Sequence, residues 1–586
     1  MPEPCLVEPA CSRERPWSAI HVRAPRGDES FVAVPPLSEA LELAHRNHER
    51  LAEAKAGVQG RTLASIRQWA RQEVYQAARE YTAGLVAGEN AADAIAPANS
   101  PATRHAESKE MAGLPVEEMD VQTTAFYVSG HQPTMFHPGV WVKNFVVGRL
   151  AQNNRGLGLN LVVDSDTFSG ASVRVPTGSV EHPGVTAVAF DESHPRQPWE
   201  EARIIHRELF ASFGRRATAA MEERGFMPLL ADYWPAAVRH AEHDPTPAGC
   251  LTAARSVRER LWGVSNLELP ISRLCALEPF LWFSAHLLAH LPRLHAIYNE
   301  VLREYRVVNR VRSRTHPVPD LRETDGWLEA PFRVWRAGDR ERRRVFARQF
   351  AGEIRLSDGE RVFAHLPLTP EKDACCAVKE LQKLPAQGIR FRTRALTTTL
   401  FTRLCFADLF VHGIGGAKYD QMTDRIICRF FGMAAPQFLT LSATLELPSP
   451  GIGAHPEDER RLRRLLRELD YNSDRHLPPV LSPDGRTLVA EKQRLIAEQN
   501  AVRFRPRSAS DSAGSGYERF RRFQEINRQL AALTREERRR IEEELQRTRM
   551  QLAAGSLLHD REYAFCLYPA EKLKRFVDHV CASALT

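Results

Sequence analysis

The sequence predicts an α/β protein with a parallel-sheet core, helical insertions and a C-terminal helical region. Its first support is an apolar segment (Ala125–Ser129), a helix-type segment (Val140–Gln152) and a second apolar segment (Leu159–Asp164), joined by short links. This strand–helix–strand order is typical of a parallel βαβ unit. A similar order recurs over residues 407–447, and from Glu457 the chain becomes strongly charged and helical.

Composition and charge exclude several classes of protein. With 586 residues we expect more than one domain. The 80 basic and 73 acidic residues leave a net charge of +7, which at this length does not imply a nucleic-acid partner. No apolar run approaches the roughly 18 residues that span a bilayer, and the N-terminus lacks an apolar signal core. We therefore expect a cytoplasmic protein without a membrane partner.

The first two predicted domains are an N-terminal helical region with a linker, 1–120, and the first half of the core, 121–200. Residues 1–36 are expected to be irregular, because they are rich in proline and charge. A helical stretch follows from Leu37 to about Gly88, and small and polar residues predict a linker over 89–120. Val173–Phe190 completes the first half-core as two strands around a turn.

An inserted helical and mixed region is predicted over 201–385. Within it, Pro279–Tyr298 is expected to be a buried helix that ends or kinks near Pro292. His286 and His290 have a spacing that can bind zinc, but their apolar neighbours and the lack of an HExxH motif favour packing. No metal site is predicted here or elsewhere.

The second half of the core is predicted over 386–450 and a coiled-coil or helical region over 451–586. The second half of the core is predicted to contain a strand (Ala407–Val411), a turn, a helix (Gln421–Phe431) that ends at Gly432, and a strand (Phe438–Leu447). The C-terminal region carries short apolar seams, and Thr534 with Glu537 predicts a capping box where a helix restarts. Such seams suit a helical hairpin or a two-helix coiled coil, and a homodimer through these helices is one expectation.

The stretch SGHQPTMFHPGVWVKN (Ser129–Asn144) is the first candidate site. It lies between a parallel strand and its helix, and open α/β sheets bind ligands at that edge. A helix beginning after Gly139 offers free N–H groups to an anion. His131 and His137 could bind phosphate or act as acid and base, and Gln132 could read a polar group. The alternative is a surface turn shaped by its prolines and glycines.

Asp164 and Asp166, in VVDSDTF, follow the next strand and are expected to face the same cleft. They could hold an amine, hydroxyl groups or a metal-bound phosphate, or simply cap a turn.

The segment HGIGGAKYD (His412–Asp420) is a second candidate site at a strand-to-helix turn, in the second half of the core. Gly413, Gly415 and Gly416 permit close backbone approach after a strand, and Lys418 adds a positive charge. The spacing is neither a Walker loop nor a Rossmann fingerprint, and a tight packing turn is the alternative.

The order of these motifs resembles the bacillithiol biosynthesis cysteine-adding enzymes, a family of cysteine ligases. That family has a GQQ-type turn, a Leu-Phe pair and a Gly before a helix, and a similar arrangement occurs here at Gly130, Gln132, Phe136 and Gly139. Downstream, RTRALTTTLFTRLCFADLFVHGIGGAKYDQMTD and FFGMAAPQFLTLSATLEL are similar to later family segments. Their matching positions are Gly413, Gly415, Tyr419, Pro436 and Ser442–Leu445.

Several positions depart from the family pattern. His131 stands in place of a Gln, and Pro133-Thr134 replaces a glycine-type continuation of the turn. The EDHDF-type strand end appears as DSDTF, without its His. The Glu of the second turn aligns with Gly416.

The resemblance implies a Rossmann-like core of the class I synthetase and nucleotidyltransferase type, with connective insertions and a dimerising coiled coil. The implied reaction joins cysteine to the amine of a glucosamine–malate conjugate in low-molecular-weight thiol biosynthesis. Its substrates would be cysteine and the amino-sugar conjugate. The cofactor is open, and ATP or another nucleotide is one candidate. The predicted catalytic residues are His131, Asp164 and Asp166. The predicted substrate-binding residues are Gly130, Gln132, His137, Gly139, Gly413, Gly415, Gly416, Lys418, Tyr419 and Asp420. Two alternatives remain: an ATP-using nucleotidyltransferase-like enzyme, and a non-catalytic scaffold.

Overall fold

A computed structural model describes residues 22–87, 120–168, 170–179, 183–313, 315–448, 455–477, 482–503 and 513–584. The predicted linker, 89–120, lies outside them apart from its last residue. The chain forms two compact units. The first comprises Met1–Val175, Thr186–Leu447 and Arg561–Thr586, and the second comprises Pro176–Val185 and Pro448–Asp560.

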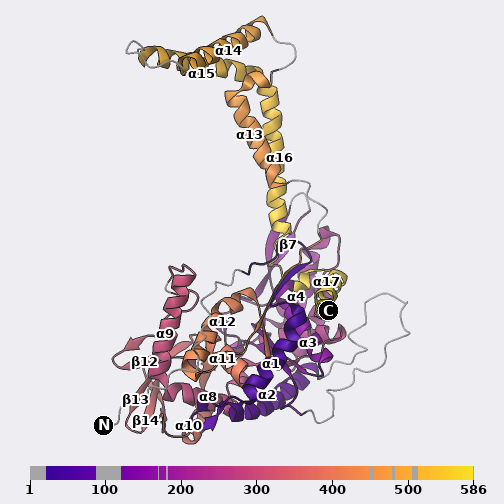
Figure 1. Ribbon diagram of the computed structural model, residues 1–586. Coiled ribbons are helices and arrows are strands. Elements are labelled where there is room, and N and C mark those ends of the chain that lie inside the picture. Colours follow the sequence, from indigo (N-terminus) through magenta and orange to yellow (C-terminus); the bar gives the residue numbers. More distant parts are fainter. Residues whose placement is uncertain are drawn as a thin grey trace, which may run out of the picture. The chain divides into compact units, whose positions relative to one another are not determined.

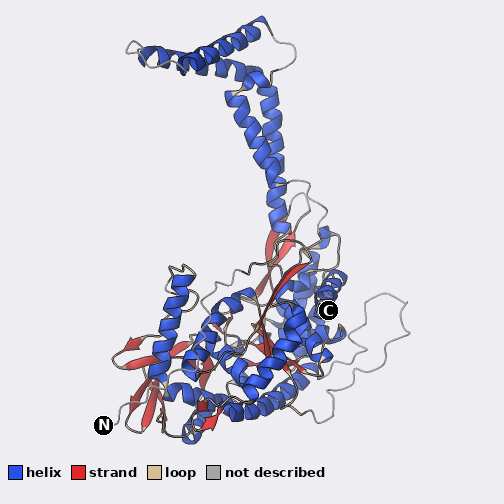
Figure 2. Ribbon diagram, in the orientation of Figure 1, coloured by secondary structure: helices blue, strands red, loops and turns tan. Residues whose placement is uncertain are grey.

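A six-stranded sheet forms the centre of the first unit (Figures 1 and 2). Its order is β1 (Ser30–Val34), β18 (Leu439–Thr444), β17 (Leu409–His412), β4 (Phe126–His131), β5 (Leu157–Val162) and β10 (Leu267–Pro270). Only β1 is antiparallel to its neighbour; the other pairs are parallel. Numbered along the chain, the five parallel strands lie in the order 3-2-1-4-5, which reverses direction between β4 and β17.

The predicted βαβ unit is confirmed, because β4 and β5 pair in parallel across α3 (Pro138–Asn153). Two edge strands were missed. β1 lies in the stretch expected to be irregular, and β10 in the stretch expected to be mainly helical. Both are short, so their own sequence pattern is weak, and each becomes a strand by pairing with an existing sheet edge.

Helices cover both faces of this sheet. On one face α2 (Leu63–Val86) packs in the same apolar cluster as Phe126 and Val128 of β4. On the other face α3 lies beside Tyr127, whose hydroxyl accepts a hydrogen bond from Asn154. The remaining helices of the first unit are α1 (Ala40–Ala52), α4 (Arg207–Ala219), α5 (Leu230–His240), α6 (Pro247–Leu261), α7 (Ile271–Leu274), α8 (Glu278–Ala289), α9 (Leu291–Val308), α10 (Cys375–Lys383), α11 (Ala395–Cys405), α12 (Ile414–Ile426) and α17 (Ala570–Ala582).

A second sheet is inserted between β10 and β17. It is antiparallel, with β11 (Glu323–Thr324), β12 (Trp327–Arg336), β13 (Arg343–Phe350), β14 (Glu353–Ser357) and β15 (Val362–Leu366) in order and β16 (Ile389–Thr393) paired to β12. β16 falls in the stretch assigned to the second half of the core, yet it belongs to this sheet. Three small pairs complete the strands: β2 (Gly57–Val58) with β3 (Arg61–Thr62), β6 (Thr167–Phe168) with β9 (Gln197–Pro198), and β7 (Ser172–Thr177) with β8 (Gly184–Ala189).

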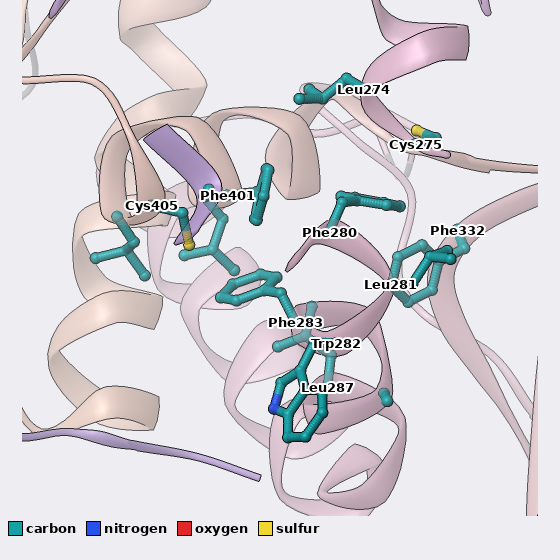
Figure 3. Close-up of a cluster of buried hydrophobic side chains, with 14 of the residues drawn as sticks. Leu274, Cys275, Phe280, Leu281, Trp282, Phe283, Leu287, Phe332, Phe401 and Cys405 are labelled. Carbon is teal, nitrogen blue, oxygen red and sulfur yellow. The ribbon is translucent and has the colours of Figure 1, made fainter. Parts of the chain in front are cut away.

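The two sheets share one hydrophobic core, and α8 runs through it (Figure 3). Phe280 and Phe283 of α8 each lie 5.3 Å, ring centre to ring centre, from Phe401 of α11. The predicted break near Pro292 is confirmed, because α8 ends at Ala289 and α9 begins at Leu291. His286 is buried against aromatic rings, as the packing interpretation expected.

The glycine-rich segment after β17 differs from its prediction as a turn. Helix α12 begins at Ile414, so Gly415 and Gly416 lie in its first turn, and a π-helical turn (Ile427–Phe431) extends it to Gly432. Glycine is a poor helix former, but at an N-terminus its backbone N–H groups are unbonded in any case. The predicted stop is confirmed, since Gly432 has a φ of 67°.

The described part of residues 455–560 is helical (Figure 2). It contains α13 (Pro456–Tyr471), α14 (Pro483–Arg503), α15 (Ala513–Leu533) and α16 (Arg535–Leu558). Leu462 and Leu469 of α13 form a small core with Ile541 and Leu545 of α16, so these apolar seams pack within one chain. The helix restarts after Thr534 as predicted, but the capping box is absent, because the Thr534 hydroxyl donates to the carbonyl of Ala531.

Among the helices of the described residues, none has the length and apolar character needed to cross a membrane.

Candidate functional site

A cavity of about 930 Å³ opens at the carboxyl ends of β4 and β17, where the strand order reverses. Open α/β sheets bind their ligands at this position. Its walls come from the starts of α3 and α12, from β12 and α11 of the inserted region, and from the segment before α17. Of the predicted site residues it brings together Gly130, His131, Gln132, His137, Gly139, Asp166, Gly413, Gly415, Gly416, Lys418 and Tyr419.

The two histidines of the first turn have different surroundings. His137 is the N-cap of α3: its Nδ1 accepts the N–H of Gly139 at 3.1 Å, and its Nε2 lies 3.9 Å from Glu562. His131 Nδ1 lies 3.3 Å from the carbonyl of Gln132, so in the neutral ring it carries the proton and leaves Nε2 as the acceptor. Burial, aided by the charge of Lys143, lowers the pKa of His131 to about 3. His131 is therefore neutral at physiological pH.

Gln132 and Asp166 form a polar chain across the cavity wall. The Gln132 amide donates to Asp166 at 2.9 Å, and Arg342 of the inserted region lies 2.8 Å from the same carboxylate. Burial tends to raise the pKa of Asp166, but these two partners outweigh it and hold the pKa below its usual value. Asp166 is thus an ionised carboxylate at the cavity surface.

Asp164 does not line the cavity. It is buried and accepts both the backbone N–H and the hydroxyl of Ser272, at the start of α7. Burial, with the charge of Glu200, raises its pKa to about 7. Its position is that of a side chain that anchors the end of β5 rather than one that reaches a ligand.

Asp420 also lies beneath the cavity surface, where it supports His412. Its carboxylate accepts His412 Nε2 at 2.8 Å, Arg403 at 2.6 Å and the hydroxyl of Thr399 at 2.7 Å. Burial tends to raise the pKa of Asp420, but Arg403 and His412 hold it well below its usual range. Since this carboxylate only accepts, Nε2 of His412 carries a proton, and the ring is fixed at the end of β17.

Lys143 is a buried cation in the cavity wall. It lies on α3 with 3% of its surface exposed. Its neighbours on the helix are satisfied, because the Trp141 and Asn144 side chains both donate to Glu259. Among the described residues Lys143 has neither a carboxylate partner nor a hydrogen bond. Burial lowers its pKa to about 8, so the ammonium group remains mostly charged at neutral pH.

Positive charge dominates the cavity lining. The carboxylates in the lining are Asp166 and Glu562. Arg333, one of the cations in the lining, has no ion pair or hydrogen bond to the described residues. Burial lowers the pKa of Arg333 to about 10. The cations are Arg23, Lys143, Arg333, Arg342, Arg394, Lys418 and Arg561. This excess suits a ligand with more than one negative group.

Several of these cavity residues were not predicted as site residues from the sequence. Lys143 and His412 lie inside the two motifs singled out, and a lysine within an otherwise apolar helix face was an available signal for the first. The arginines of the inserted sheet and Arg561 lie far away along the chain, and only folding brings them to the cavity. Within the described ranges, no group of three or more His, Cys, Asp or Glu side chains is placed to hold a metal ion.

No protein-family model matches this sequence, and a search of curated proteins finds no significant match. The geometry of the cavity therefore carries the functional argument.

Proposed function

We propose that this protein is an amide-forming enzyme that adds cysteine to an amino-sugar conjugate of the glucosamine–malate type. The observation that carries the proposal is the cation-lined cavity at the point where the strand order reverses. Both substrates bear carboxylates, which these cations would neutralise. Asp166, ionised at the cavity surface, would hold an ammonium group such as that of cysteine.

The architecture supports the same proposal. The strand order 3-2-1-4-5 agrees with a Rossmann-like core, the inserted sheet occupies the place of a connective domain, and the pairing of α13 with α16 agrees with a coiled-coil arm. A homodimer through these helices and a cytoplasmic location belong to the proposal. The resemblance of the motifs implied a parallel core, an inserted domain and a helical arm, and the sheet order, the inserted sheet and the α13–α16 pair support these three parts.

The chemistry sets a further requirement. Amide formation joins the carboxyl carbon of cysteine to the sugar amine, and the departing oxygen must leave as water or as an activated group. Condensation with water as leaving group is unfavourable in water, so coupling to ATP or another nucleotide is expected. The neutral His131, whose Nε2 carries no proton and can act as an acceptor, would orient a substrate N–H or O–H group.

A nucleotidyltransferase-like enzyme is the second candidate. The placement of His131 and His137 after the first parallel strand, beside many cations, suits a triphosphate. Release of pyrophosphate that depends on magnesium and ATP, without consumption of cysteine, would favour this candidate. Cysteine-dependent turnover would favour the ligase.

Thiol metabolite profiling in a deletion strain tests the leading proposal. We expect loss of a cysteine-containing thiol and accumulation of its amine precursor. Complementation with a variant carrying His131→Ala, Gln132→Ala and Asp166→Asn should fail, whereas His45→Ala with Glu49→Gln on the exposed face of α1 should restore the thiol. An unchanged profile in the deletion strain would refute the ligase. A deletion phenotype that the triple variant fully rescues would indicate a scaffold.

A further inference from the structure

Lys143 is a charged group that has no counter-ion among the described residues of the first unit. A buried ammonium group is costly unless it is paired. The charge of Lys143 helps to lower the pKa of both His131 and His412. The ammonium group is therefore compensated by no described side chain, and it faces the cavity.

The start of α12 borders the same cavity with unbonded amides. Gly413 is its N-cap and has no side chain to accept a hydrogen bond. The N–H groups of Ile414, Gly415 and Gly416 donate to no described residue. A Cβ atom on Gly415 would meet nothing within 4 Å, so the space beside these amides is free. On Gly416, by contrast, a Cβ would lie 2.7 Å from Nδ1 of His412, so a glycine is needed there for the ring to stay in place.

We infer that Lys143 and the open N-terminus of α12 form a subsite for one oxyanion of the substrate, a phosphate or a carboxylate. The amides give directional hydrogen bonds and the helix dipole, and the lysine gives the full positive charge. His412 is bound through Nε2 to Asp420, and burial lowers its pKa, so it adds no negative charge to the subsite. This subsite rests on the proposed function, because it assigns one anionic group of the substrate to the start of α12. Its experimental test is independent of the test of the reaction.

Isothermal titration calorimetry with sodium phosphate and with sodium L-malate, at constant ionic strength, tests the subsite in the full-length protein. We expect at least one anion to bind the wild type and Lys143→Met to weaken it about 10-fold or more, as for loss of a charged hydrogen bond. Lys379→Met, an exposed lysine on α10, is the matched control and should bind as the wild type does. Preference for phosphate or malate identifies the oxyanion.

A second variant tests the amides. Ile414→Pro removes one N–H at the first helical position, where proline is compatible with a helix, and Gly413 already has the extended ψ of 170° that precedes proline well. We expect several-fold weaker anion binding than in Ile414→Ala, which changes only the side chain. Unfolding curves check that both variants are folded, and Lys143→Met should be at least as stable as the wild type without anion.

Equal anion affinity in the wild type and Lys143→Met would overturn the subsite, as would the absence of binding by both anions. Neither result would contradict the proposed reaction, because that reaction is tested by the thiol profile of the deletion strain. Conversely, an unchanged thiol profile together with Lys143-dependent anion binding would leave the subsite standing and remove the ligase.

Discussion

The two strand-to-helix turns that border the cavity are both rich in glycine and histidine, but their helices begin differently. In the first, Pro138 begins the helix, His137 caps it, and a Cβ on Gly139 would lie 2.0 Å from the carbonyl oxygen of Ala443. In the second, Gly413 provides no cap and a Cβ on Gly415 meets no atom. Gly139 thus permits close backbone packing at the first turn, whereas Gly415 borders open space at the second.

The supports of the two turns differ as well. Beneath the second turn, Asp420 is buried and ionised among Arg403, His412 and Thr399. Beside the first, the Asp166 side chain is 35% exposed. We therefore expect the second turn to depend on the buried charge of Asp420, and the first turn to tolerate loss of the charge of Asp166.

The largest effect is expected for Asp420→Asn. Removing this charge leaves the buried Arg403 with Asp424 as its remaining carboxylate partner and weakens the support of His412, so the free energy of unfolding should fall by about 3 kcal/mol. Asp166→Asn, which breaks a partly exposed pair, should cost about 1 kcal/mol or less. Urea denaturation followed by circular dichroism measures both. Similar losses for the two variants would show that the second turn is not specially dependent on its buried carboxylate.

Gly139→Ala should be the next most damaging. Its methyl group would overlap the backbone of β18, which cannot rotate away as a side chain could, and overpacking of this kind costs about 1–3 kcal/mol. We expect a lower thermal unfolding midpoint. An unchanged midpoint would mean that α3 and β18 can separate without loss, contrary to the close contact.

Acidification should affect the first turn through His131. Because its folded pKa is lowered to about 3 from an unfolded value near 6.5, its contribution to stability is complete above pH 6.5 and declines as the pH falls toward 3. The loss is at most about 1.4 kcal/mol per pH unit. We expect His131→Asn to flatten the stability profile between pH 6.5 and 4.5. The profile of a His45→Asn variant, altered on the exposed surface of α1, should match the wild type.

Gly415→Ala should have the smallest effect on stability. Alanine favours a helix over glycine by up to about 1 kcal/mol, and the new methyl group enters open space, so the unfolding midpoint should stay level or rise slightly. The same methyl group narrows the proposed oxyanion subsite, so calorimetry should show weaker phosphate or malate binding. A clear loss of stability would show that this turn is packed like the first one.

Elements with a local signal could be predicted from the amino-acid sequence. The apolar patterns of β4 and β5 with α3 between them, the break near Pro292 and the stop at Gly432 all follow from periodicity and from proline or glycine chemistry, and each is present in the structure. For the same reason, most of the residues of both glycine-containing motifs were placed correctly at one sheet edge. Parallel strands end at a common edge whatever the details of their packing.

The partners and burial of several candidate site residues depend on tertiary contacts. Asp164 and Asp420 look like site residues in the sequence, yet Ser272 and Arg403 hold them beneath the surface. The lack of a described partner for the buried Lys143 is visible only in the folded chain, and Arg333 reaches the cavity from an inserted sheet distant along the chain. Burial and the choice of partners depend on contacts between remote segments, and these set both the pKa of a group and whether it meets a ligand.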